Sequence, residues 1–379
     1  MHPEDDVTIS DISDVSDATY ASIIPAVPTR ESAPPVPPPV PVGAGAMRDL
    51  KGEDRWKLRT ESIGGESILF AVVADGHGGQ AAAQRCADTV VPYILDAAAG
   101  DASGAALRRA GRAAFQRLHA EVRSTQANDG TTCTVCMTNP LRGELTTVHV
   151  GDSAAILVPH VVKGTPARKP TRLTAEHRLQ ESTREQARVV TMGGKVGRLQ
   201  HPVTKEPAGP LRAFPGGVAC ARSIGDADVG SLISAVPASS TVPLRWLAHT
   251  GWDVVVASDG VWDALSPAAI VRLCRHAPRA PAQNLAELIT EQAVSARHAF
   301  NNSGFMVPRD DTTCVVLRCA AVVDAHNCDG VHPKSGGGGC TLPSRCELPS
   351  LVAEPIELDD SYIEDEDAAA EAQGQARGS

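Results

Sequence analysis

Several carboxylates of this chain stand where apolar, strand-like runs begin or end. Asp75 follows FAVVA, Asp152 follows TTVHVG and Asp259 follows VVVAS. Asp310 precedes TTCVVL, and Glu53-Asp54 stands just before the first strand expected in the globular part. A single acid of this kind is readily explained as a turn residue or a helix cap. The whole set instead indicates a functional site, because core strands repeatedly deliver an acid to their ends.

Grouped carboxylates repel one another and raise each other's pKa unless a cation lies between them. Oxygen-only ligand sets suit hard divalent cations such as Mg²⁺ or Mn²⁺, and two such ions about 4 Å apart are the usual clamp for hydrolysing a phosphate ester. In such a site Asp75 would bridge both ions, and Gly76 would offer its carbonyl because glycine lets the backbone approach closely. His77 would stand beside the cluster and protonate a leaving alkoxide.

Alternating strand-like and helical segments are expected to position these acids. The patterns predict strands at 68–74, 131–138, 145–150, 154–158, 218–222, 253–257 and 312–318, and helices at 79–97, 104–124, 175–191, 267–276 and 282–299. Ser266-Pro267 is typical of a helix start, with a capping hydroxyl and a proline at the first turn. Two hairpin-like pairs, 131–138 with 145–150 and then 154–158, favour antiparallel sheet over a doubly wound one.

Composition divides the chain into three zones. Residues 1–46 are acidic and then proline-rich, which predicts a disordered tail or polyproline II. A ligand for an SH3-type domain is the alternative, although no arginine closely flanks the proline run. Residues 47–321 are expected to form the globular domain, and residues 322–379 a disordered Gly-rich and acidic C-terminal tail.

Charge is distributed unevenly between these zones. The chain carries a net charge of −10, of which residues 1–46 contribute −6 and residues 347–379 contribute −9. The middle is therefore mildly basic, with clusters of Lys and Arg at 163–172 and 195–212. These clusters are either a solvated face or a site for anionic groups. The acidic C-terminal tail either keeps the protein soluble or lies over the basic segment 195–212 and competes with substrate there.

Hydropathy and cysteine usage predict a soluble intracellular protein, cytoplasmic or nuclear. No apolar run reaches the roughly 20 residues of a membrane helix, and the first residues lack a signal-peptide pattern. Cys133 and Cys136 form a CxxC in a strand-like run, where residues three apart point to opposite faces, so buried reduced thiols are expected rather than a redox or zinc pair. The late cysteines Cys328, Cys340 and Cys346 match no zinc spacing, although metal binding there stays open.

Nine short motifs follow one another along the middle of the chain. They are GEDRW (52–56), ADGHGG (74–79), GTTCTV (130–135), VGDSA (150–154), LTAEHR (173–178), RVVTMGGKV (188–196), ACARSIGDAD (219–228), ASDGVWDAL (257–265) and RDDTTCVV (309–316). In type and order this series resembles the metal-dependent serine/threonine protein phosphatases, the PPM family, also called type 2C. DGHGG and SDGVWD are its most specific members.

The resemblance implies an α+β fold, a four-layer α-β-β-α sandwich of two antiparallel sheets flanked by helices, with a site for two Mg²⁺ or Mn²⁺ ions at one end between the sheets. The metal ligands carried over from the family are Glu53, the bridging Asp75, Gly76 through its carbonyl, Asp259 and Asp310. The positions that hold metal-bound water, or a third and weakly held metal, correspond to Asp54, Asp152 and Asp263. His77 matches the candidate general acid.

The activity that the resemblance implies is hydrolysis of phosphoserine or phosphothreonine by direct attack of a water that the two ions activate. The expected partner is a phosphorylated protein, with neither nucleic acid nor membrane, and the chain is expected to be a monomer. Two alternatives stay open. One is a catalytically weak or inactive pseudophosphatase that acts as a binding module, and the other is a phosphatase for small phosphate esters.

The residue that grips the substrate phosphate departs from the family's pattern. Many members carry an arginine four residues before the metal-binding acid Glu53, but here Asp49 stands at that position and Arg48 is one place away. A local bulge would bring Arg48 into place as the phosphate-binding residue. Lys51 or Arg55 would otherwise substitute, the lysine less well because it lacks the bidentate fork of a guanidinium.

Other departures are milder. Ala154 stands where the family often has arginine, and Glu176 replaces an aspartate at an expected helix start. Asp311 replaces an asparagine and is expected to shape the turn. His149 and His177 match no role in the family and are expected to be ordinary strand and helix residues.

Overall fold

The computed structural model describes residues 40–125, 128–162, 167–247, 249–276, 278, 280–296 and 310–321. By its contacts the chain divides into two units, Met1–Pro37 and Pro38–Ser379. Every described element belongs to the second unit. Most of the two expected tails, and the late cysteines among them, lie outside the described residues.

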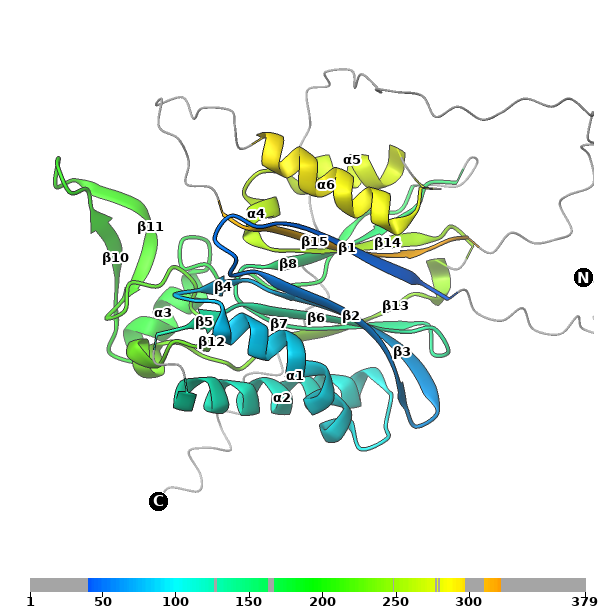
Figure 1. Cartoon of the computed structure of the whole chain (residues 1–379), viewed down its shortest axis with the longest axis horizontal. Coiled ribbons are helices and arrows are strands. Elements are labelled where there is room, and N and C mark those ends of the chain that lie inside the picture. The colour runs from blue at the N-terminus through cyan, green and yellow to red at the C-terminus, as the bar shows by residue number, and fades with distance from the viewer. Residues whose placement is uncertain are drawn as a thin grey trace, which may run out of the picture. The chain divides into compact units, whose positions relative to one another are not determined.

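Two five-stranded antiparallel sheets form the centre of the second unit (Figure 1). The first sheet has the order β1 (Val42–Arg48), β15 (Thr312–Cys319), β14 (Trp252–Ala257), β8 (Ala154–Pro159) and β9 (Thr171–Arg172). The second has the order β13 (Ala238–Pro243), β7 (Glu144–Val150), β6 (Cys133–Asn139), β3 (Glu66–Ala74) and β2 (Arg55–Ile63). The central strands of the two sheets, such as β3 and β14, are rich in Val, Ile, Leu and Ala, and they are buried on both faces.

Helices cover the outer face of each sheet, as Figure 1 shows. The second sheet packs against α1 (Ala81–Ala98) and α2 (Gly104–Thr125), and the first against α5 (Pro267–His276) and α6 (Ala282–Ala296), with the single turn α4 (Asp259–Trp262) at the end of β14. The expected four-layer sandwich is therefore confirmed. None of the helices in the described ranges combines the length and the apolar content that a membrane crossing requires.

The CxxC prediction is confirmed by the two cores. Cys136 packs between the sheets with Ala71 and Val256, whereas Cys133 lies on the opposite face of β6, in the core beneath α1 and α2. The seven cysteines within the described residues are free thiols, and six of them are buried. The predicted cap is also present, because the backbone N–H of Ala269 donates to Ser266 Oγ at 3.3 Å as α5 begins at Pro267.

The segment 175–182 is not helical, although the expected helix covered 175–191. Helix α3 spans only Thr183–Thr191, and Ser182 caps it by accepting a hydrogen bond from the N–H of Glu185. Ahead of this cap the chain pairs with another segment: Leu179 N–H donates to Ala219 O, and Ala221 N–H donates to His177 O. Tertiary backbone pairing thus replaces helical hydrogen bonds, and for the same reason the strand expected at 218–222 is reduced to isolated bridges.

Strand β8 also departs from the expected hairpins. The pair β6–β7 is a hairpin as predicted. After β7, however, the chain turns through Gly151, whose φ of 95° suits only glycine, and β8 crosses to the other sheet to pair with β14 and β9. This crossing carries the loop with Asp152 from one sheet to the other.

Several strands were not expected at all. Strand β1 begins at Val42, within the segment assigned to the N-terminal tail, so the folded region starts earlier than the predicted boundary at 47. A two-stranded hairpin, β10 (Lys195–Gln200) with β11 (Pro207–Phe214), extends from the sandwich (Figure 1). The remaining short elements are β4 (Gly76–His77), β5 (Gly130–Thr131) and β12 (Ile224–Gly225), which form a small third sheet, and the 3₁₀ turns η1 (Ala227–Leu232) and η2 (Arg245–Leu247).

Candidate active site

The aspartates at strand ends meet around one hollow of about 320 Å³. Asp75 follows β3, Asp152 follows β7, Asp259 follows β14 and Asp310 precedes β15, and all four line the hollow together with His77. Residues far apart in the sequence are thus gathered because both sheets direct these strand ends to the same place.

Three carboxylates of this cluster have raised pKa values. Burial, followed by the charges of Asp54 and Asp259, raises the pKa of Asp75 well above its ordinary value. Burial and the charge of Asp152 raise the pKa of Asp259 to about 7. Burial raises the pKa of Asp54 to about 6, even though Thr313 Oγ1 donates to its carboxylate at 2.7 Å. Mutual repulsion of this kind favours a cation between the acids, and an oxygen-only donor set fits Mg²⁺ or Mn²⁺.

Two cationic side chains form ion pairs with some of these carboxylates. Lys51 Nζ lies 2.8 Å from Asp310 Oδ2. Arg178 lies within ion-pair distance of Asp152, Asp259 and Asp263. In the part of the chain that the structure describes, no three acidic, His or Cys side chains already form a metal-ligand set. One carboxylate oxygen of Asp310 faces Lys51 instead, and the three acids around Arg178 each direct one oxygen to its guanidinium.

Gly76 lies where the backbone passes closest to Glu53. A Cβ at position 76 would lie 2.6 Å from the carbonyl oxygen of Glu53, so only glycine fits. The backbone N–H of Glu53 donates to Asp311 Oδ2 at 2.6 Å, and Gly76, next to its carbonyl, lines the hollow. The structure therefore brings all the predicted acidic ligands to one region, while their assignment as metal ligands stays a prediction.

Asp311 organises the loop that carries Glu53 and Asp54. Its Oδ1 accepts the backbone N–H groups of Leu50 at 2.5 Å, Lys51 at 2.6 Å and Gly52 at 3.2 Å. Its Oδ2 accepts those of Glu53 at 2.6 Å and Asp54 at 3.1 Å. Burial opposes ionisation here, but these hydrogen bonds outweigh it and lower the pKa of Asp311 to about 2.

We expect Asp311→Ala to lower the free energy of unfolding at pH 7 by about 2.5 kcal/mol, the free-energy equivalent of a pKa difference near 2 units. The side chain is only 1% exposed, so solvent screens this interaction little. Because the folded pKa is lowered, the stabilisation is complete above the unfolded pKa of 3.8 and is lost as the pH falls toward 2. Urea unfolding of wild type and variant at several pH values measures the difference.

The matched control for this prediction is Asp49→Ala, which removes an exposed carboxylate from the same loop. Its unfolding free energy should change by no more than about 0.5 kcal/mol. Equal losses in both variants, or a loss in Asp311→Ala that persists at pH 2, would show that the carboxylate does not stabilise the loop through its charge.

His77 is paired with an acid that the sequence reasoning did not single out. His77 Nε2 lies 2.7 Å from Asp226 Oδ1, and Ser223 Oγ donates to the other oxygen of Asp226. Burial lowers the pKa of His77, but the hydrogen bond and charge of Asp226 outweigh it and raise the pKa overall. Asp226 adopts a left-handed φ of 52°, which aspartate tolerates better than most residues. Its motif, ARSIGDAD, was the available signal.

The predicted phosphate-binding residue lies elsewhere. Over the whole of β1 the pairing with β15 is in continuous register through Arg48, so the bulge that would redirect Arg48 is not present. Its guanidinium lies 3.5 Å from Glu291 Oε1 on α6, and both side chains are exposed. A role for Arg48 in binding phosphate stays a prediction. The basic side chains that line the hollow are those of Lys51 and Arg212.

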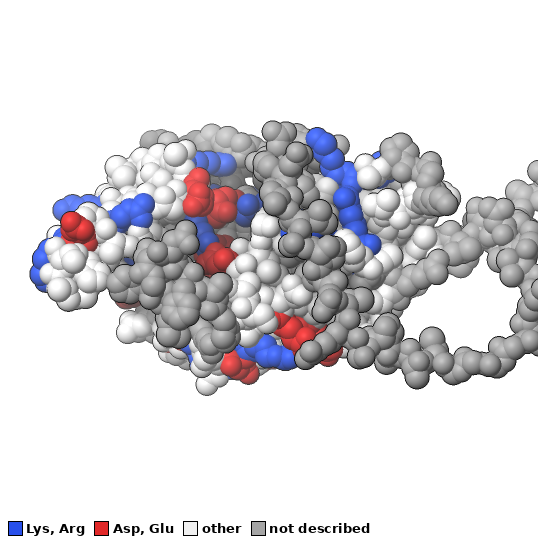
Figure 2. All heavy atoms as spheres, turned by 90° about the horizontal axis from the view of Figure 1, so that it is seen from above, with Lys and Arg blue, Asp and Glu red and all other residues white. Residues whose placement is uncertain are grey.

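Arg212 comes from the basic segment 195–212 and lies on β11. Its Nη1 donates to Gly217 O at 2.6 Å. On the face seen in Figure 2 acidic and basic side chains lie next to one another, and Lys and Arg gather at the β10–β11 end. Exposed side chains of this hairpin include Lys195, Arg198 and Lys205.

His149 and His177 form a buried pair beneath the Asp152 loop. Their rings stack with centroids 4.6 Å apart, and Gly151 lies within hydrogen-bonding distance of His177 Nδ1. Burial lowers the pKa of each imidazole well below its ordinary value. His149 is the expected strand residue, whereas His177 precedes helix α3 instead of belonging to it.

The sequence of this chain is similar to those of known protein phosphatases. The family model described as Protein phosphatase 2C matches residues 53–301. Probable protein phosphatase 2C 3 of Oryza sativa subsp. japonica is 38% identical over 253 residues, which are 66% of this chain and 47% of that protein. Probable protein phosphatase 2C 15 of Arabidopsis thaliana is 36% identical over 239 residues, which are 61% of this chain and 52% of that protein. This chain therefore spans about half the length of such curated relatives.

Solved structures share the fold at lower identity. A serine-threonine phosphatase 2C from Toxoplasma gondii matches with a TM-score of 0.60 and 21% identity, over 75% of this chain and 98% of that one. A C. elegans sex determining protein matches with a TM-score of 0.58 and 23% identity, over 73% of this chain and 64% of that one. Given the matched range of its sequence, the chain belongs to the protein phosphatase 2C family.

Proposed function

We propose that this chain is a metal-dependent protein serine/threonine phosphatase that hydrolyses phosphoserine and phosphothreonine. The observation that carries the proposal is the meeting of four aspartates around one hollow, with the His77–Asp226 pair among its lining residues. An intracellular location is part of the proposal, and the free thiols of the described cysteines support it.

Glu53, Asp75, Asp259 and Asp310, with the carbonyl of Gly76, would hold two Mg²⁺ or Mn²⁺ ions. When bound, these ions supply the positive charge that acidifies a water and neutralises phosphoryl oxygens. Two backbone hydrogen bonds with Thr132 hold Asp75 in position. The N–H of Asp75 donates to Thr132 Oγ1 at 3.1 Å, and its carbonyl accepts the N–H of Thr132 at 2.9 Å.

His77 supplies the proton that the leaving serine or threonine oxygen requires. Because Asp226 raises its pKa, a larger fraction of His77 carries a proton near neutral pH than an isolated imidazole would. The carboxylate also orients the ring through the 2.7 Å contact at Nε2. Lys51 and Arg212, whose side chains line the hollow, would contact the phosphate of a bound phosphopeptide.

The alternative is a pseudophosphatase that binds partners without turnover. The observation in its favour is the position of Arg48, whose guanidinium pairs with Glu291 instead of lining the hollow. The acidic cluster and the His77–Asp226 pair oppose it, since a binding module has no need of either. A phosphatase for small phosphate esters would use the same groups.

The test is phosphate release from phosphoserine and phosphothreonine peptides by the full chain, with Mn²⁺ and Mg²⁺ titrated from zero. We expect turnover that requires metal, stops in EDTA and returns when metal is added back. Undiminished turnover in EDTA would refute the metal-dependent mechanism. Mn²⁺ binding without hydrolysis of any phosphopeptide or of p-nitrophenyl phosphate would favour the pseudophosphatase.

We expect Asp226→Asn to move the alkaline limb of the pH–rate profile to lower pH. The substitution removes the charge that raises the pKa of His77, so the ring loses its proton, and with it the ability to act as an acid, at a lower pH. Asparagine tolerates the left-handed backbone at this position. The measurement is kcat between pH 6 and 10 with saturating Mn²⁺ and phosphopeptide.

Asp228→Asn is the matched control, because it removes an exposed carboxylate two residues further on. Its pH–rate profile should coincide with that of the wild type. If the alkaline limb of Asp226→Asn also stayed in place, His77 would not be the group whose deprotonation limits turnover.

A further inference from the structure

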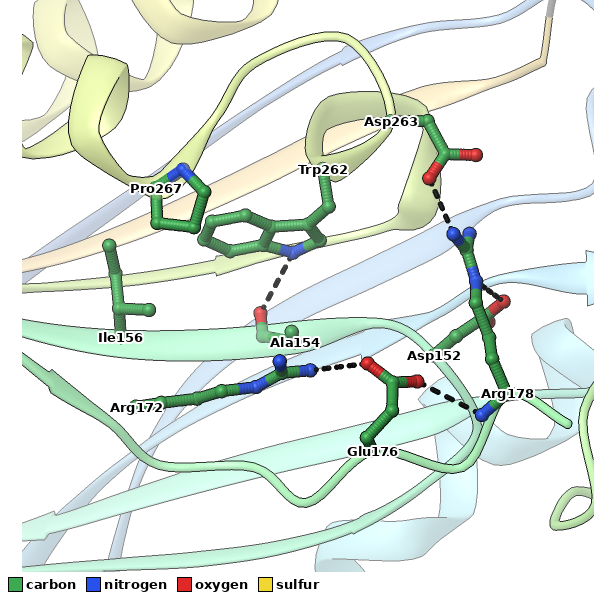
Figure 3. A pocket seen from close by; sticks show the side chains of 9 residues that line it. All are labelled: Asp152, Ala154, Ile156, Arg172, Glu176, Arg178, Trp262, Asp263 and Pro267. Atoms are coloured by element: carbon green, nitrogen blue, oxygen red, sulfur yellow. Dashed lines mark hydrogen bonds and ion pairs between the residues drawn. The ribbon is translucent and has the colours of Figure 1, made fainter. Parts of the chain in front are cut away.

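The guanidinium of Arg178 lies among three carboxylates beside the hollow, as Figure 3 shows for two of them. Its Nε lies 2.7 Å from Asp152 Oδ2, its Nη1 2.6 Å from Asp263 Oδ1 and its Nη2 3.1 Å from Asp259 Oδ2. Each of the three guanidinium nitrogens therefore contacts a different acid. The planar fork of arginine suits this arrangement, whereas the single point charge of a lysine does not.

The three acids come from both sheets. Asp152 lies in the crossing between β7 and β8, and Asp259 and Asp263 lie at the start and just past the end of α4. Arg178 itself belongs to the segment ahead of α3. Its guanidinium thus adds a side-chain link between the Asp152 loop and α4, next to the backbone pairing of Ala154 with Ala257. The start of α4 also supplies Asp259 to the proposed metal site.

The backbone on either side of Arg178 is held in place. Its N–H donates to Glu176 Oε1 at 2.9 Å, and Glu176 in turn pairs with Arg172 at 3.0 Å. Its carbonyl accepts the N–H of Ser182 at 2.9 Å. The side chain is 28% exposed, so the ion pairs are partly shielded from solvent. These contacts fix the backbone that carries the guanidinium, so the fold determines where the guanidinium lies.

We propose that Arg178 is a resident cation, which takes the place of a divalent ion between Asp152, Asp259 and Asp263. Asp152 and Asp263 correspond to family positions that hold either metal-bound water or a third metal, and the ion pairs of Arg178 favour neither a third ion nor an open site. The inference rests on the proposed function only in that Asp259 also serves the two-ion site.

Two physical arguments support this assignment. First, a covalently tethered cation competes at a high effective concentration, which a dissolved ion at low concentration cannot match. Second, a divalent ion entering between the three acids would leave the partly buried guanidinium without its carboxylates, and removing one partner of such a pair is costly. The guanidinium consequently neutralises these three acids, and metal binds only at the ligands of the proposed two-ion site.

The experiment counts Mn²⁺ ions bound per full-length chain, by electron paramagnetic resonance of free Mn²⁺ during titration. We expect Arg178→Gln to bind one more Mn²⁺ than the wild type. We expect Asp263→Asn to leave the wild-type count unchanged, because no ion uses Asp263 while the guanidinium is present. In the double variant Arg178→Gln/Asp263→Asn the additional ion should be lost again.

Arg198→Gln is the matched control, since it removes an arginine of β10 that donates to Gly209 O and to Gln180 Oε1 and contacts none of the three acids. Its Mn²⁺ count should equal that of the wild type. Thermal melting in EDTA adds a second readout: Arg178→Gln should melt at a lower temperature than Arg198→Gln, and Mn²⁺ should restore more of the loss.

An equal Mn²⁺ count in wild type and Arg178→Gln would overturn the inference, and so would the loss of one ion in Asp263→Asn alone. The Asp263→Asn comparison uses the wild-type arginine, so it decides the question even if Arg178→Gln fails to fold. These counts do not depend on turnover. Failure of the proposed function would instead appear as a full set of bound ions without phosphate release.

Discussion

Asp75→Asn is expected to lower kcat for phosphopeptide hydrolysis by about 10³-fold or more, since removing one preorganised electrostatic contact alone typically costs about 10²–10³. The substitution keeps the size of the side chain and the backbone contacts with Thr132, which do not involve the carboxylate. It removes the charge at the centre of the acidic cluster. Phosphate release at saturating Mn²⁺ measures the loss.

The same substitution should stabilise the protein in EDTA. Burial and neighbouring acids raise the pKa of Asp75, so its ionisation costs more free energy in the folded chain than in the unfolded one. An uncharged amide relieves that repulsion, and the melting temperature in EDTA should rise while activity with metal falls. Such opposite signs are characteristic of a functional carboxylate and are not expected of one that serves the fold.

Asp96→Asn is the matched control for both measurements, because its carboxylate is 78% exposed on α1 and faces an arginine of α2. Activity and melting temperature should both stay close to wild type. Turnover of Asp75→Asn within tenfold of the wild type would show that Asp75 does not hold the metal ions.

The central strands were predictable because their composition reflects burial on both faces. FAVVA in β3 and VVVA in β14 read as core strands, and both are. Strand β1, VGAGAMR, lacks that pattern. It contains glycines because bulky side chains pack directly against its backbone: a Cβ at Gly45 would lie 2.7 Å from the Trp56 ring. Such a strand is recognisable only when its neighbour is known.

The acids of the site were predictable because each stands at the end of a recognisable strand or within a specific motif. Their cationic partners were not. Arg178 lies in the LTAEHR motif, at a position that the periodicity assigned to a helix, and its contacts depend on the irregular pairing of 177–179 with 219–221. Arg48 was expected near the phosphate from its spacing to Glu53 alone, yet the continuous register of β1 directs it toward α6. Spacing along the chain does not determine where a long side chain ends.

Asp311 illustrates the same limit from the opposite side. An aspartate beside a ligand acid indicates a local turn, whereas in the structure its carboxylate holds the distant loop of residues 50–54. That one carboxylate accepts five backbone N–H groups from residues 50–54 depends on a contact across some 260 residues of sequence. The sequence thus locates the site and its acids, while the tertiary structure determines which groups neutralise and orient them.

Gly260→Ala is expected to destabilise the fold by about 3 kcal/mol or more, at or above the upper end of the range for overpacked sites. A Cβ at position 260 would lie 1.9 Å from the carbonyl oxygen of Asp311, and a backbone atom cannot swing aside as a side chain can. The single turn α4 would have to move away from the start of β15. Because Asp259 begins α4 and Asp310 precedes β15, that movement should also weaken Mn²⁺ binding.

Urea unfolding in EDTA measures the stability term without metal, and Mn²⁺ titration of the folded variant measures the binding term. Gly197→Ala is the matched control, since a Cβ there would meet nothing within 4 Å, and its unfolding free energy should change by no more than about 0.5 kcal/mol. Equal midpoints for the two variants would mean that α4 accommodates a methyl group without cost. A stable Gly260→Ala chain with wild-type Mn²⁺ affinity would further mean that the spacing of Asp259 and Asp310 is not fixed by this contact, and that the metal ions themselves would have to set it.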